Sequence, residues 1–172
     1  KHECEKAACI LGIDDMLFCD YDDFPLEMSK DRLELLAKEI RLYRPDFILT
    51  HDQGMDTGNR DHTRTAQAVM GAYTIASALG AAVDGAPVSP RQTPMFGFEQ
   101  MFPEACDFKP DIYIDISEQF DIKLKAMQCL ETQKGSIDSY IEKAKLRGSH
   151  CAARGGRPDC QYAEAFTMYG PV

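Results

Sequence analysis

Two of the chain's four histidines and three of its aspartates lie in the twelve residues from His51 to His62. They directly follow residues 46–50, an apolar run that is typical of a buried strand. Imidazole and carboxylate groups together are the ligands that a divalent metal such as zinc binds in proteins. This stretch is therefore a candidate metal site.

The same residues also have a purely structural interpretation. Asp61 is a good N-cap for a helix that starts beside it, and His62 can simply be solvated. Polar loops between a strand and a helix are common, so the spacing alone does not decide between the two interpretations.

The elements around this loop alternate in type. Apolar spacing predicts a helix over residues 1–11, which Gly12 would end, and a short strand over residues 16–19. Ser29 can cap a second helix, whose apolar stripe runs to Tyr43 before Arg44-Pro45 ends it. A strand, a helix and a strand in this order indicate a right-handed parallel unit.

Beyond the loop we expect a helix over residues 63–79, a linker over residues 85–91, and strands at residues 95–98 and 112–116. Helices are expected over residues 118–132 and 137–146, with an irregular tail over residues 148–158. This alternation predicts an α/β fold with a mainly parallel sheet. Ligands bind beyond the carboxyl ends of the strands in such sheets, which again selects the loop after Thr50.

Composition excludes several classes of function. The 172 residues suit a single domain, and the formal net charge of −9 argues against nucleic-acid binding or docking on an anionic membrane. The short basic run at residues 143–147 is typical of a solvated helix end. Seven scattered cysteines with no C-x-x-C pattern favour reduced thiols in a cytoplasmic protein.

Several motifs resemble those of the LmbE-like (PIG-L) family of metal-dependent enzymes. Thr50-His51, a polar loop and then Asp61-His62-Thr63-Arg64-Thr65 is similar to the family's second metal motif. The segment Asp22-Asp23-Phe24-Pro25-Leu26 and the closing Tyr162-Ala163-Glu164-Ala165-Phe166 also resemble family signatures. The resemblance implies a Rossmann-like three-layer α/β fold over residues 1–172.

In that family, a first motif of the His-Pro-Asp-Asp type supplies two metal ligands and a carboxylate base. This sequence contains no such motif, so we expect an N-terminal βαβ portion, of the order of 30 residues, to be missing from it. The resemblance then assigns one metal ligand here, His62, for zinc or another divalent ion.

The resemblance is nearest to the 4-oxalomesaconate hydratase branch, whose members add water to a small polycarboxylate in aromatic-acid breakdown. Family deacetylases have a histidine where this chain has Asn59, and an amide cannot deliver a proton at neutral pH. Phe98-Glu99, the segment 106–111 and Arg147-Gly148 also fit the hydratase branch. Met101 departs from it, because a histidine is expected shortly after Phe-Glu.

The resemblance thus implies catalytic roles for three residues. His51 is a candidate for the missing proton-transfer group, Asn59 for an oxyanion contact, and Asp61 for orienting a neighbouring imidazole. Arg64, Arg147 or Arg154 can bind substrate carboxylates, although an arginine taken singly is usually a surface residue.

Asp23, Glu99 and Glu164 complete the predicted substrate-binding set. Asp23 and Glu164 belong to family signatures, but each can equally brace a loop. Relatives often form symmetric oligomers, so we expect a homo-oligomer. Two alternatives stay open: a metal-dependent N-deacetylase of N-acetylglucosaminyl compounds, and a degenerate, metal-free binding or assembly subunit.

Overall fold

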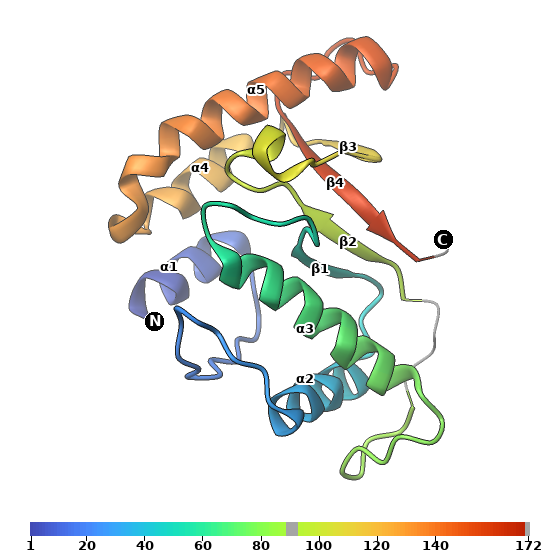
Figure 1. Cartoon of the computed structure of the whole chain (residues 1–172). Helices are drawn as coiled ribbons and strands as arrows, with labels where there is room; N and C mark the ends of the chain where they lie inside the picture. Colours follow the sequence, from blue (N-terminus) through green and yellow to red (C-terminus); the bar gives the residue numbers. More distant parts are fainter. Residues whose placement is uncertain (89–92, 171–172) are drawn as a thin grey trace. The chain divides into compact units, whose positions relative to one another are not determined.

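The structure is a computed structural model that describes residues 1–88 and 93–170. Its elements follow the chain in this order: α1 (His2–Leu11), α2 (Lys30–Tyr43), β1 (Ile48–His51), α3 (Arg60–Ser77), β2 (Met95–Phe98), η1 (Pro103–Cys106), β3 (Ile112–Asp115), α4 (Phe120–Gln128), η2 (Glu131–Ser136), α5 (Ile137–Arg154) and β4 (Ala163–Tyr169). The strands are ordered β1-β2-β4-β3 (Figure 1). The predicted alternation of strands and helices holds from β1 through α3 to β2, whereas, in the described residues, α1 and α2 follow each other with no strand between them and only η2 lies between α4 and α5.

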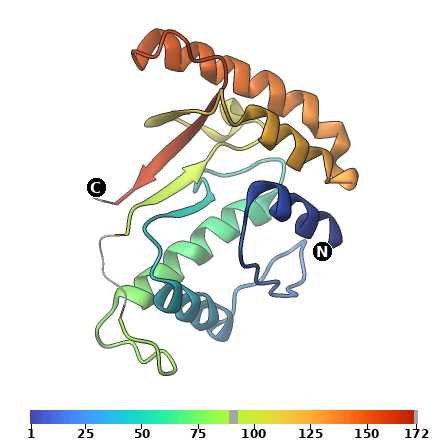
Figure 2. The same cartoon turned by 180° about the vertical axis from the view of Figure 1, so that it is seen from behind.

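The chain divides into two compact units. One comprises residues 1–20 and 113–165, and the other comprises residues 21–112 and 166–172. In the first unit, α1 packs against α4 (Figure 2). In the second unit, α2 packs against α3, and α3 packs against β1. The candidate loop therefore belongs to the second unit.

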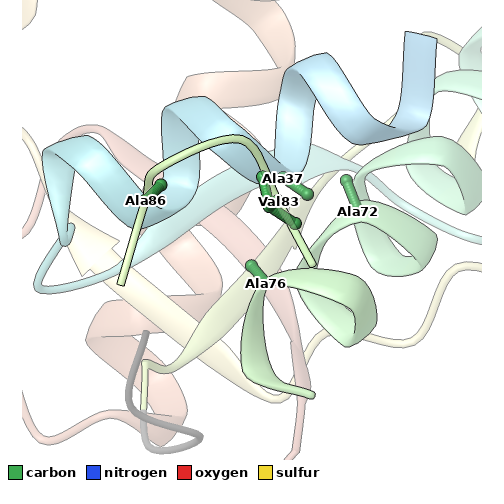
Figure 3. Packing of buried hydrophobic residues seen from close by; sticks show 5 residues of the cluster. All are labelled: Ala37, Ala72, Ala76, Val83 and Ala86. Carbon is green, nitrogen blue, oxygen red and sulfur yellow. The ribbon is translucent and has the colours of Figure 1, made fainter. Parts of the chain in front are cut away.

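Small side chains let α2 and α3 approach each other closely. Ala37 of α2 and Ala72 and Ala76 of α3 have no exposed surface, and Val83 and Ala86 from the following loop close the cluster (Figure 3). An alanine interface brings two helix backbones together with little side-chain entropy lost. This packing fixes α3, and with it the loop at the N-terminus of α3.

Arg41 of α2 is buried beside that interface, although its side chain is charged. Its guanidinium donates hydrogen bonds to five backbone carbonyls at and beyond the end of α3, those of Ile75, Ala76, Ala78, Ala81 and Ala86. The carbonyls at a helix C-terminus carry partial negative charge and lack partners within the helix. Arg41 thus supplies the C-terminal end of α3 with the donors that it needs.

The sheet is mixed rather than mainly parallel. β1 pairs with β2 in parallel, from Ile48 with Met95 to His51 with Phe98. β2 pairs with β4 antiparallel, from Met95 with Tyr169 to Phe98 with Phe166. The sequence analysis did not predict β4, so the expected parallel character holds only for β1 and β2. Their crossover contains α3, as a parallel connection requires.

Two further predictions were wrong. Residues 16–19 form no strand, and Leu17 is 56% exposed. A short apolar run forms a strand only where a neighbouring strand can pair with its backbone. The strand-helix-strand unit expected before residue 50 is therefore absent from the described residues. The tail expected at residues 148–158 is helical as far as Arg154.

The helix ends were predicted well. Gly12 ends α1 in the left-handed conformation, and the Ser29 side chain accepts a hydrogen bond from Arg32 N at 3.3 Å as the cap of α2. Residues 85–88 of the expected linker form neither helix nor strand, and residues 89–91 lie outside the described residues. All seven cysteines are free thiols. Within the described part of the chain, every helix is too short or too polar to cross a membrane.

Candidate functional site

The two histidines of the loop lie against each other. His51 is the last residue of β1 and His62 is in the first turn of α3, so the loop between them brings its two ends together. Their imidazole rings are nearly parallel, at an angle of 9°, with centroids 4.1 Å apart. The ring of Phe98, at the end of β2, lies 4.5 Å from His51 on centroids. The structure thus brings the two histidines of the candidate metal motif into contact.

The environment of His51 keeps its imidazole neutral. Burial disfavours the charged form and the neighbouring His62 lowers the pKa further, while Asp56 raises it by less. The net result is a pKa of about 4. At neutral pH the His51 ring therefore carries one N–H and one lone pair, and it is not present as the imidazolium that acts as an acid.

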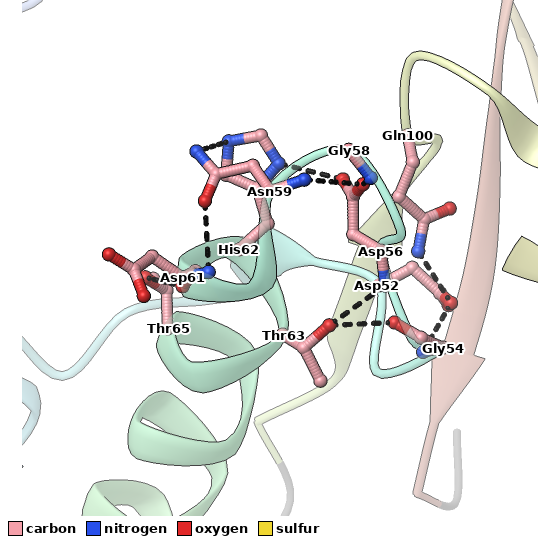
Figure 4. Close-up of polar contacts among 10 residues, drawn as sticks. All are labelled: Asp52, Gly54, Asp56, Gly58, Asn59, Asp61, His62, Thr63, Thr65 and Gln100. Carbon is pink, nitrogen blue, oxygen red and sulfur yellow. Dashed lines mark hydrogen bonds and ion pairs between the residues drawn. The ribbon is translucent and has the colours of Figure 1, made fainter. Parts of the chain in front are cut away.

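Asp56 is the carboxylate that contacts an imidazole. Its Oδ2 lies 2.8 Å from Nδ1 of His62, and its Oδ1 accepts hydrogen bonds from Gly58 N at 2.8 Å and Asn59 N at 3.0 Å (Figure 4). Burial would raise the pKa of Asp56, but the hydrogen bonds from His62 and the two backbone amides outweigh it and lower the pKa. Asp56 is therefore a buried, ionised hydrogen-bond acceptor.

Asp61 does not have the role that the sequence analysis gave it. Its Oδ2 accepts hydrogen bonds from Phe24 N at 2.7 Å and Leu26 N at 3.0 Å, and its Oδ1 pairs with Arg64 at 2.5 Å. The hydrogen bond from Phe24 N is the main cause of its lowered pKa. Asp61 ties residues 24–26 to α3 and is not the partner of an imidazole.

The cap of α3 is Asn59 rather than Asp61. The Asn59 Oδ1 accepts a hydrogen bond from Asp61 N at 2.9 Å, and the Asn59 Nδ2 lies 3.3 Å from Nε2 of His62 (Figure 4). The interpretation of this loop as a helix cap was thus right in kind, but the cap lies two residues before the predicted one. Asn59 both starts the helix and faces the histidine.

The predicted substrate-binding residues of this unit are less closely grouped. The Arg64 side chain is 42% exposed despite the pair with Asp61. Asp23 is exposed beside the segment that Asp61 holds, and Glu99 is half-buried after β2. Their roles remain predictions.

Arg147 and Glu164 belong to the other compact unit. Arg147 is buried in α5, with its Nη1 3.1 Å from His150 Nδ1. It is therefore not a surface residue, although most arginines in proteins are. Glu164 forms an ion pair with Lys123 of α4. Arg154 is exposed at the end of α5. Each of the first two already has a structural contact within its own unit.

Asp52 forms a second polar network that the sequence analysis missed. Its Oδ2 accepts hydrogen bonds from the hydroxyls of Tyr169 and Thr167, and its Oδ1 accepts from Gly54 N at 2.8 Å and Gln100 Nε2 at 3.1 Å. Burial would raise the pKa of Asp52, but these hydrogen bonds lower it. The network lines a pocket of about 540 Å³ and joins the loop to β4. No sequence signal indicated it, because β4 itself was not predicted.

The metal prediction can be compared with the available side chains. Within residues 1–88 and 93–170, no group of three or more histidine, cysteine or acidic side chains is placed to hold a metal ion. His62 fits the role of one ligand, since Asp56 contacts its Nδ1 and leaves Nε2 as the nitrogen that can coordinate a metal ion. The described residues thus fit part of a metal site.

Comparisons with known proteins agree with this fold and loop. Residues 1–73 match the PIG-L family, described as GlcNAc-PI de-N-acetylase. A curated 4-oxalmesaconate hydratase from Pseudomonas putida KT2440 is 34% identical over 152 residues, which are 86% of this chain and 56% of that protein. The chain thus spans little more than half the length of this curated relative.

Solved structures extend the match to nearly the whole chain. The crystal structure of GalB, the 4-carboxy-2-hydroxymuconate hydratase from P. putida KT2440, is 31% identical, with a TM-score of 0.90 over 99% of this chain and 70% of that one. The N,N'-diacetylchitobiose deacetylase from Pyrococcus horikoshii shares the fold at 19% identity, with a TM-score of 0.72 over 97% of this chain and 61% of that one. This chain belongs to the PIG-L (LmbE-like) family.

Proposed function

We propose that this chain is part of a metal-dependent hydratase that adds water to the carbon–carbon double bond of a small unsaturated keto-polycarboxylate. The observation that carries the proposal is the match to the P. putida hydratase structure over 99% of the chain. Asn59, where family deacetylases have a histidine, supports the same branch. A cytoplasmic location, a part in aromatic-acid breakdown and a homo-oligomeric state belong to the proposal through the family resemblance.

In this proposal His62 is one ligand of a zinc or other divalent ion. The remaining ligands are expected from the family's His-Pro-Asp-Asp motif, which these 172 residues do not contain. A bound metal would supply Lewis acidity, polarising a substrate oxygen or a water molecule.

His51 is assigned to proton transfer as an acceptor. Hydration of a double bond removes a proton from water and delivers a proton to carbon, so it needs both a base and an acid. With a pKa of about 4, His51 is neutral at physiological pH and cannot serve as the acid. Its ring stacks on that of His62, the proposed metal ligand.

Asn59 and Arg64 are assigned to binding rather than to proton transfer. The Asn59 amide can donate a hydrogen bond to a developing oxyanion but carries no titratable proton. Arg64 keeps exposed guanidinium N–H groups that can bind a substrate carboxylate in a bidentate way. The Arg64 contact suits a polycarboxylate better than a neutral sugar amide.

A metal-dependent N-deacetylase is the second candidate, because the matching family is described as a de-N-acetylase. Amide hydrolysis requires a proton for the leaving amine. Asn59 cannot provide it, and His51 is neutral at the working pH. Hydration needs an acid as well, so the observation that disfavours deacetylation in particular is Asn59, which stands where family deacetylases have a histidine.

The test uses the purified product of the complete gene, loaded with zinc, and a panel of unsaturated keto-polycarboxylates. Hydration removes the conjugated double bond, so ultraviolet absorbance should fall with zinc, but not with a chelator or in the His62→Ala variant. His2→Ala is the matched control, because His2 is an exposed histidine of α1 and should leave the rate unchanged. Release of acetate from N-acetylglucosaminyl compounds, without hydration, would favour the deacetylase instead. If the protein shows no hydration, releases no acetate and binds no metal, it is instead a binding or assembly subunit.

A further inference from the structure

The two ring nitrogens of His62 have different partners. Nδ1 lies 2.8 Å from the Asp56 carboxylate, and Nε2 lies 3.3 Å from the side-chain nitrogen of Asn59 (Figure 4). An ionised carboxylate only accepts hydrogen bonds, so it requires a proton on Nδ1. An amide nitrogen only donates, so it requires a lone pair on Nε2. Both neighbours therefore select the same neutral tautomer.

The orientation of Asn59 is fixed independently of His62. Its Oδ1 accepts the hydrogen bond from Asp61 N that caps α3, at 2.9 Å. This contact identifies the oxygen of the amide group and leaves the nitrogen to face the imidazole. The Nε2 lone pair of His62 therefore follows from the helix cap as well as from Asp56.

Asp56 is held rigidly enough to orient a ring. It is 4% exposed, and backbone amides of Gly58 and Asn59 fix its Oδ1. Its own N–H donates to Thr63 Oγ1 at 3.0 Å, and that hydroxyl donates to Gly54 O at 3.0 Å. The carboxylate is thus braced by the loop and by α3 at the same time.

We propose that Asp56 is the positioning residue of His62, holding its imidazole as the Nδ1–H tautomer so that Nε2 is the atom offered to a metal ion. The Asn59 amide, which contacts Nε2, has to move aside when the metal binds. The part of this inference that concerns the metal rests on the proposed function, whereas the tautomer does not. A carboxylate behind a metal-binding histidine typically strengthens metal affinity by about 10- to 100-fold.

The chain offers a matched control for Asp56. Asp52 lies in the same loop, is 6% exposed and is also held by a backbone amide. Its partners are Gly54, Gln100, Thr167 and Tyr169, none of which is an imidazole. Asp52→Asn therefore removes a buried carboxylate from the loop without touching His62.

The first measurement is the tautomer, from long-range ¹H–¹⁵N spectra of the metal-free gene product, with the His62 signals assigned by their loss in His62→Ala. We expect protonated Nδ1 and unprotonated Nε2 in the wild type and in Asp52→Asn, and a changed or mixed tautomer in Asp56→Asn. A wild-type His62 protonated on Nε2 would overturn the proposal, whether or not the variant folds.

The second measurement is zinc affinity, by competition with a chromophoric chelator. Asp56→Asn should bind zinc about 10- to 100-fold more weakly than wild type, while Asp52→Asn binds as wild type does. Wild-type affinity in Asp56→Asn, together with loss of binding in His62→Ala, would reject the role of Asp56 and leave the proposed metal site standing. If the tautomer of His62 depends on Asp56 but the wild-type protein binds no zinc, the role of Asp56 in selecting the tautomer stands and the proposed metal site is rejected.

Discussion

The hydroxyl of Tyr169, near the end of β4, donates a hydrogen bond to the carboxylate of Asp52, which lies just after β1. Tyr169 also accepts a hydrogen bond from Gln53 N at 2.8 Å. A single phenol thus joins the last strand of the chain to the loop that contains the candidate site. This contact stabilises the start of the loop that runs from β1 to His62.

Replacing Tyr169 with phenylalanine should destabilise the protein. The variant removes the donor to an ionised carboxylate and the acceptor of the Gln53 amide at once. Hydrogen bonds to charged groups contribute about 1.5 to 3 kcal/mol, so we expect a loss of this size in the free energy of unfolding, measured in urea. Tyr73→Phe, at a half-buried tyrosine of α3, is the control and should change it by less than Tyr169→Phe does.

The same contact predicts a dependence of stability on alkaline pH. Burial and the Asp52 carboxylate raise the pKa of Tyr169 from 10.0 to about 12 in the folded state. A raised folded pKa means that the stabilisation is complete below the unfolded pKa and is lost as pH rises through the folded one. The difference in unfolding free energy between wild type and Tyr169→Phe should therefore shrink between pH 10.0 and about 12. A difference that stays constant over this range would exclude the raised pKa.

Arg41→Met should be among the most destabilising single changes in the unit of residues 21–112 and 166–172. Arg41 is 3% exposed, and its guanidinium donates to five backbone carbonyls, which methionine would leave without donors. Each buried group that loses its partner costs about 1 to 3 kcal/mol, so the free energy of unfolding should fall by at least about 3 kcal/mol. Arg154→Met, at the exposed end of α5, should cost less than about 1 kcal/mol in the same thermal or urea unfolding experiment. Similar losses in both variants would contradict the capping role of Arg41.

Gly54→Ala tests how tightly the loop is packed. A Cβ at Gly54 would lie 2.7 Å from Cys106 O and 2.8 Å from Asp52 Oδ1, so the loop has to shift. We expect destabilisation of about 1 to 3 kcal/mol, as for other overpacked sites. At Gly80 a Cβ would meet no atom within 4 Å, so Gly80→Ala should be neutral or slightly stabilising. Equal changes in thermal stability for the two variants would show that the loop around Gly54 is not tightly packed.

The sequence predicts the helix ends well because they depend on local chemistry. Ser29 and Gly12 act within one turn of their own helices. The helix α5 was predicted too short because Gly148 is a weak helix former, yet tertiary packing overrides its propensity. A Cβ at Gly148 would lie 2.3 Å from Gln161 O, so the glycine allows this helix to contact the chain before β4.

The candidate site was predictable in its histidines but not in its carboxylates. The motif placed His51 and His62 at the two ends of one loop, and closing the loop makes them neighbours. Asp56-Thr57-Gly58 carries the local signal of a turn in which an aspartate accepts an amide two residues on. That signal does not reveal that the second oxygen reaches His62, because the contact depends on where α3 begins.

The role of His62 as a metal ligand is tested most directly by the metal content of the complete gene product, measured by inductively coupled plasma mass spectrometry. We expect about one zinc or other divalent ion per chain in the wild type and in His2→Ala, and its loss in His62→Ala. Metal that stays at the wild-type level in a folded His62→Ala variant, or no metal in any of the three proteins, would contradict it.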